Sequence, residues 1–209
     1  IDAEGMYLVP GLIDSHMHTE SSGLSLTELS RLLLPRGITT IMYGHEIANV
    51  LGVSGLKMVR SESKQVPLKI FFQAPTSVPW APGLESTAVD LTVEEVEEIL
   101  DWEETVSLGE SDYFDILNLD ANIIKKIEAA KSRGLIVNGH IGALSGKGLN
   151  AVIGVGFNDD HESSMPEEVI EKLRLGIRVM LREANLPWLA PAITDRNIDT
   201  RNVLLCIDD

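Results

Sequence analysis

The sequence predicts a closed, parallel (β/α)₈ barrel, because short apolar runs alternate with amphipathic helical patterns and eight such runs can be recognised. An open, doubly wound sheet is the alternative for the same alternation, and the eight strands favour the barrel. The 209 residues allow about 26 per unit, near the lower limit for this fold. We therefore expect one shortened TIM-type barrel domain over residues 1–209, without its eighth helix, from a larger protein.

The predicted strands are short runs rich in β-branched and apolar residues, and polar residues follow each run. They cover residues 7–14, 37–43, 68–74, 105–109, 134–139, 156–160, 177–181 and 203–207.

Capping residues mark the starts of several helices between these strands. Thr92 with Glu95 has the spacing of a capping box, Asp120 can cap the next helix, and Pro166 suits a first helical turn. The corresponding helical patterns cover residues 91–104, 121–134 and 166–176.

Composition and charge exclude several classes of function. The net charge of −15 argues against a surface for nucleic acid or anionic membrane, since both need clustered Lys and Arg. A single cysteine, Cys206, excludes internal disulfides and zinc sites built from several thiolates. No apolar run approaches a membrane span, and the N-terminal residues lack the basic flank of a signal peptide, so we expect a cytoplasmic protein.

All five histidines follow predicted strands: His16 and His18 the first, His45 the second, His140 the fifth and His161 the sixth. Glu110 follows the fourth strand and Asp208 the eighth. The carboxyl ends of barrel strands meet at one mouth, so these side chains are expected to share a site. Residues i and i+2 of a strand face the same side, which directs both imidazoles of the HxH motif inward. A lone histidine at a strand end is more often an ordinary polar residue, but imidazoles with carboxylates suit Zn, Fe or Mn.

Six blocks in the sequence resemble those of the metal-dependent amidohydrolase superfamily, and within it the bacterial and archaeal adenine deaminases. They are VPGLIDSHMHTESS, GHEIANVLG, GHIGALSGKGLNA, DDHESS, EKLRLGIRVMLRE and LLCIDD, and they span essentially the whole chain. HEIANVLG and LSGKGLNA are the parts specific to adenine deaminases.

The resemblance implies two divalent metal ions, Fe, Mn or Zn. His16 and His18 would bind the more buried ion, and Glu110 would bridge to the second. The full set of implied ligands is His16, His18, Glu110, His140, His161 and Asp208.

The resemblance also implies hydrolytic deamination of adenine to hypoxanthine and ammonia, with Glu110 and Asp208 as the catalytic carboxylates. Metal coordination lowers the pKa of water toward about 7, and Asp208 would carry the proton. Its neighbour Asp209 is the less favoured acid. His45 and Glu46 would lie beside the purine substrate, while the loop around Lys147 has no assigned role.

Three loops depart from the expected family pattern. They contain Tyr43-Gly44, residues 111–117 and Ala184-Asn185. The departures leave open another amidohydrolase reaction, on a different aminated heterocycle or a cyclic amide, or a non-catalytic metal-binding fragment. Glu110 stands where cyclic amidohydrolases often carry a carboxylated lysine, which favours the deaminase. The cytidine-type zinc deaminases are excluded, since their PCxxC motif needs two cysteines.

The resemblance further implies that a small β-sandwich and a C-terminal domain accompany the barrel in the family. Their absence from these residues would leave apolar barrel surface uncovered, so we expect a homo-oligomer.

Overall fold

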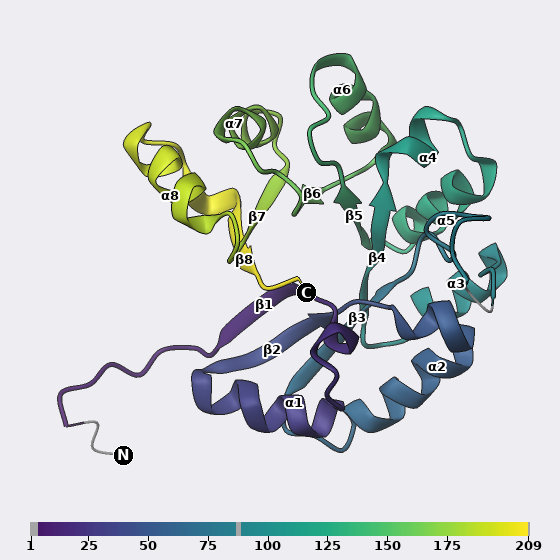
Figure 1. The fold of residues 1–209 in the computed structure, drawn as a ribbon, viewed down its shortest axis with the longest axis horizontal. Coiled ribbons are helices and arrows are strands. Elements are labelled where there is room, and N and C mark those ends of the chain that lie inside the picture. The colour runs from purple at the N-terminus through teal and green to yellow at the C-terminus, as the bar shows by residue number, and fades with distance from the viewer. Residues whose placement is uncertain (1–3, 87–88, 209) are drawn as a thin grey trace.

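The computed structural model describes residues 4–86 and 89–208. Eight parallel strands stand in chain order, with helices outside them, and the ends of the first and last strands meet near the centre of the view (Figure 1). The strands are β1 Leu12–Met17, β2 Ile38–Tyr43, β3 Lys69–Ala74, β4 Thr105–Asp112, β5 Ile136–His140, β6 Asp159–Asp160, β7 Arg178–Arg182 and β8 Val203–Cys206.

The strands form two sheets whose edges are joined by backbone bridges. One sheet runs β1-β2-β3-β4-β5 and the other β6-β7-β8. A parallel bridge from Val137 to Phe157 joins the sheets on one side, and a second from Met17 to Asp208 joins them on the other. Every strand thus neighbours the strands before and after it in sequence, as in a (β/α)₈ barrel and unlike a doubly wound sheet.

Helices fill the seven connections between successive strands. They are α1 Leu26–Leu33, α2 Ile47–Ser63, α3 Val93–Leu100, α4 Tyr113–Leu117, α5 Ala121–Ser132, α6 Gly146–Val155, α7 Pro166–Arg174 and α8 Leu186–Asp195, with 3₁₀ turns η1 Thr19–Ser22, η2 Leu34–Arg36 and η3 Thr200–Asn202. The predicted caps are confirmed: Thr92 and Glu95 form a capping box, and Asp120 accepts hydrogen bonds from the first turn of α5. The apolar faces of these helices pack on the outside of the strands.

The first predicted strand is wrong in its bounds. Residues 7–11 form no strand, and Tyr7 and Leu8 are 94% and 97% exposed. This segment extends away from the barrel in Figure 1, so its apolar residues meet no partner surface in the described chain. β1 begins at Leu12 instead, which places His16 inside the strand rather than after it.

No helix in the described part of the chain is both long and apolar enough to cross a membrane.

Candidate metal centre

All five histidines lie at the carboxyl ends of the strands, as predicted. The ring centroids of His16 and His161 are 4.2 Å apart, those of His140 and His161 5.3 Å, and those of His18 and His45 6.4 Å. His16 and His18 lie 4.6 Å apart and complete a continuous row of rings across the barrel mouth.

Two imidazoles and an aspartate converge at the deeper part of this site. The Nε2 atoms of His16 and His18 are 2.9 Å apart. Asp208 Oδ1 lies 3.4 Å from Nε2 of His16 and 3.3 Å from Nε2 of His18. All three residues are buried. The two ring nitrogens and the carboxylate oxygen therefore face one small space, as ligands of a cation do.

Glu110 lies between the two halves of the site. Its Oε1 is 3.6 Å from His18 Nε2, whereas its Oε2 is 2.9 Å from His140 Nδ1 and 2.8 Å from His161 Nε2. One carboxylate thus faces both pairs of histidines. This placement fits the bridging position that the family resemblance implies for Glu110.

Three groups of residues could each hold a metal ion, since their ligand atoms lie within 4.8 Å of one another. They are His16 with His18 and Glu110, His16 with His161 and Asp208, and Glu110 with His140 and His161. Every predicted ligand belongs to at least one group, and the residues present fit a centre of imidazole and carboxylate ligands.

The carboxylates at this centre are held in their ionised form. Burial alone would raise the pKa of Glu110, but hydrogen bonds with His140 and His161 hold it well below its ordinary value. Burial likewise opposes ionisation of Asp208, and bonds with His16, His18 and Arg182 lower its pKa. Metal ligation requires deprotonated carboxylates, so both acids are prepared for it.

The histidines respond in opposite directions to the same surroundings. Burial and the neighbouring His161 lower the pKa of His16 to about 4. Burial also lowers the pKa of His18, but its bonds with Asp208 and Glu46 outweigh that effect and raise the pKa to about 10. A cation bound there would replace the proton between these rings and carboxylates.

His45 and Glu46, which were predicted to lie beside the substrate, have different contacts. Glu46 forms an ion-pair contact with Nδ1 of His18, one of the predicted ligands. His45 is buried and belongs to none of the three ligand groups, and its Nδ1 has no hydrogen-bond partner in the described residues. Gly44 allows His18 to lie here, because a Cβ at position 44 would be 2.4 Å from His18 Nδ1.

Two charged residues at the barrel mouth, Arg182 and Glu162, were not among the predicted site residues. Arg182 Nη1 lies 2.6 Å from Glu162 Oε1 and also pairs with Asp208 Oδ2. Arg182 ends β7 and Glu162 follows His161, so their position at strand ends was the signal that could have found them.

The loops that depart from the family pattern contain structural contacts. Tyr43 is fully buried, its ring centroid lies 5.4 Å from that of Phe72, and its hydroxyl donates to Glu20. Ser111 shares a 2.8 Å hydrogen bond with Thr76. Asn185 is also buried; it accepts from the Arg182 amide and donates to the Ser163 carbonyl. These three side chains therefore pack within the protein.

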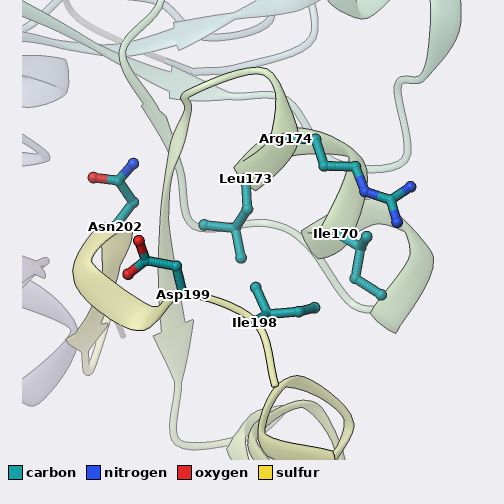
Figure 2. Close-up of a pocket in the computed structure, with 6 residues that line it drawn as sticks. All are labelled: Ile170, Leu173, Arg174, Ile198, Asp199 and Asn202. Carbon is teal, nitrogen blue, oxygen red and sulfur yellow. The ribbon is translucent and has the colours of Figure 1, made fainter. Parts of the chain in front are cut away.

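One hollow lies away from this centre. The pocket in Figure 2 is on the outside of the barrel, between α7 and the segment that leads to β8, and none of its lining residues belongs to the ligand groups. They are Ile170, Leu173, Arg174, Ile198, Asp199 and Asn202.

The family model described as the amidohydrolase family matches residues 7–207. The chain belongs to this family. The match includes nearly all of the described barrel and every predicted metal ligand except Asp208, which directly follows it.

The similar curated proteins include several named adenine deaminase. Adenine deaminase 3 of Rhizobium meliloti is 42% identical over 217 residues, and the match covers 100% of this chain and 36% of that protein. The adenine deaminase of Thermosipho africanus is 40% identical over 94% of this chain and 36% of its own length. The chain thus spans about a third of the length of these relatives.

Among solved structures, the chain resembles the crystal structure of an uncharacterized protein with a TM-score of 0.50. The two are 13% identical, and the match covers 95% of this chain and 65% of the other. At this identity the likeness concerns the fold alone.

Proposed function

We propose that this chain is the barrel of a metal-dependent aminohydrolase that converts adenine and water to hypoxanthine and ammonia. The observation that carries the proposal is the convergence of four histidines, Glu110 and Asp208 at one barrel mouth. The adenine deaminase relatives support the choice of substrate.

The centre would hold two divalent ions of Fe, Mn or Zn. His16 and His18 would hold one, His140 and His161 the other, and Glu110, which faces both pairs of histidines, would be a ligand shared between them. When bound, such ions lower the pKa of water from 15.7 toward about 7 and so supply hydroxide at neutral pH.

The difficult step is the loss of ammonia from C6 of an aromatic ring. Attack at C6 becomes easier as a ring nitrogen gains a proton, and the amine leaves as ammonia only after it too is protonated. The attacking water supplies both protons: it loses one when its oxygen bonds to C6, and the resulting C6 hydroxyl loses the other as the carbonyl forms and the C6–N bond breaks. A single carboxylate can carry them in turn, the first to the ring nitrogen and the second to the amine.

Asp208 is the residue proposed for this proton transfer. Its Oδ1 faces His16 and His18, where the attacking water would lie, while its Oδ2 pairs with Arg182. Arg182 would keep the carboxylate directed at the site. His45 and Glu46 would lie beside the purine, with Glu46 also orienting His18.

Metal analysis followed by an ammonia-release assay tests the proposal. Protein purified with Mn²⁺, Fe²⁺ or Zn²⁺ supplied should contain close to two ions per chain and release ammonia from adenine faster than from guanine or cytosine. It should also open the ring of a cyclic amide more slowly, which is followed by absorbance because that reaction releases no ammonia. Two ions without any ammonia from adenine would refute deamination by this chain. Faster reaction with a cyclic amide would favour the other amidohydrolase chemistry, and no bound ion would refute the metal centre.

A further inference from the structure

A row of buried amide and carboxylate side chains lies directly beneath His16. Gln73 Oε1 is 2.9 Å from His16 Nδ1, and Gln73 Nε2 donates to Asn138 Oδ1 at 3.2 Å. Asn138 Nδ2 in turn donates to Asp159 Oδ2 at 2.6 Å. The four residues come from β1, β3, β5 and β6, and each is at most 2% exposed.

The donor and the acceptor of each hydrogen bond in this row can be worked out from Asp159 at its end, because an ionised carboxylate can only accept. The Asp159 carboxylate accepts from both Asn138 Nδ2 and the Gly139 amide, which is 3.1 Å from Oδ1. With its NH₂ group committed to Asp159, Asn138 can offer only its oxygen to Gln73, so Gln73 must donate there. The remaining Gln73 oxygen is an acceptor, and it requires a proton on Nδ1 of His16.

The consequence for His16 is a single tautomer of the neutral ring. With the proton on Nδ1, the lone pair is on Nε2, the atom that faces His18 and Asp208. A neutral imidazole without such a partner can place its proton on either nitrogen, and the tautomer with the proton on Nε2 cannot bind a metal there.

Burying polar side chains costs free energy that apolar side chains would not, which indicates that these groups have a role besides filling the barrel interior. Barrel interiors are normally filled by layers of branched apolar side chains. A buried polar row is tolerated only when every member has its partner, as here. The row also borders a cavity of about 280 Å³ inside the barrel, which leaves space for a side chain of slightly different shape.

We propose that Gln73, Asn138 and Asp159 are positioning residues that fix the tautomer and ring orientation of His16 and thereby set the metal affinity of the centre. The inference rests on the metal-binding part of the proposed function and is independent of the substrate. Partners of this kind typically change metal affinity or activity about 10- to 100-fold when they are removed.

Gln73→Met removes both hydrogen bonds of the central amide at nearly constant side-chain length. We expect the affinity for Zn²⁺, measured by competition with a chromophoric chelator, to fall about 10- to 100-fold. The matched control is Gln65→Met, because Gln65 lies in an exposed turn far from the site. In the metal-free protein, ¹⁵N NMR of labelled histidine should show His16 protonated on Nδ1, and Gln73→Met should shift its resonances toward the other tautomer.

Gln73→Glu separates positioning from packing. A glutamate still accepts from His16 Nδ1, so it should keep the tautomer and restore most of the affinity, even if the repulsion of Asn138 Oδ1 lowers the melting temperature. Unchanged affinity in Gln73→Met, or equal losses in Gln73→Met and Gln73→Glu, would overturn the proposal. If the parent protein binds no zinc, the metal-binding part of the proposed function fails, while the NMR measurement still supports or refutes the role of Gln73.

Discussion

Lys172 of α7 is fully buried, and its ammonium group joins three segments near the metal centre. It lies 2.9 Å from Asp160 Oδ2, donates to Ser163 Oγ at 2.8 Å, and donates to the carbonyl of Gly142. Asp160 Oδ1 meanwhile accepts from the amides of Ile141 and Gly142 at 2.8 and 3.2 Å. The ion pair thus ties the loop after β5 to the end of β6.

Lys172→Met should destabilise the protein strongly, because it leaves the Asp160 carboxylate buried without its cation. Breaking one partner of a buried pair costs about 3–5 kcal/mol. Total stabilities are about 5–15 kcal/mol, so a large part of the free energy of unfolding would be lost. With a urea slope of about 3 kcal/mol per molar, the midpoint measured by circular dichroism should fall by about 1 to 1.7 M.

The loss of stability in Lys172→Met should also depend on pH. Burial would raise the pKa of Asp160, but Lys172 outweighs this and holds it below its ordinary value. A depressed carboxylate pKa contributes stability that is present above the unfolded pKa, about 3.9, and lost as the pH falls through the folded value. Without Lys172 the carboxylate takes up a proton more readily, so Lys172→Met should cost less at pH 4 than at pH 7.

A double variant tests the pairing itself. Lys172→Met with Asp160→Asn removes both charges, and its loss should be smaller than the sum of the two single losses. Asp101→Asn is the control, since Asp101 pairs with Arg133 on the surface at 2.7 Å and its change should leave the urea midpoint unaltered. A parent-like midpoint for Lys172→Met, or additive losses, would refute the reasoning.

Three further substitutions have distinct expected outcomes. Asp208→Asn should keep the fold, shown by circular dichroism, while ammonia release falls about 10²- to 10⁴-fold, and parent-like turnover would remove it as the proton carrier. Gly44→Ala should weaken zinc binding in the chelator assay, because its Cβ would displace His18, whereas Gly154→Ala has open space and should not; equal affinities would contradict this. Thr92→Ala should lower the free energy of unfolding by about 1 kcal/mol through loss of the helix cap, and a stability unchanged in urea would show that the cap contributes nothing.

Most of the fold could be predicted because each strand signal is local. Runs such as residues 37–43 and 68–74 are apolar, β-branched and bounded by turn residues, and strands form there. Residues 7–11 have the same apolar character, yet they form no strand, because composition does not reveal whether a partner strand or core exists. β6 is reduced to Asp159–Asp160 for a related reason: its pairing with β7 is confined to those two residues.

The candidate site was predictable in its ligands and less so in their partners. His16 and His18 stand out by spacing, but nothing local predicts that Gln73, 57 residues from His16 in the sequence, accepts from the His16 ring. Such contacts depend on the register between strands. Glu46 was predicted to lie beside the substrate, and its contact with His18 arises from the absence of a side chain at Gly44. The predicted contrast between Asp208 and Asp209 stays a prediction, because Asp209 lies outside the described residues.

The junction between β1 and the residues after β8 has a consequence for how the protein behaves in solution. Two backbone hydrogen bonds hold it, from the His18 amide to the Asp208 carbonyl and from the Asp208 amide to the His16 carbonyl. His16 and His18 lie on the β1 side of this junction and Asp208 on the β8 side, so an ion bound by all three would hold the two sides together. If the junction opened, two unpaired strand edges would be offered to other molecules, next to the exposed side chains of Leu12 and Ile13. A metal ion bound at this junction would therefore also reduce edge-to-edge aggregation of the chain.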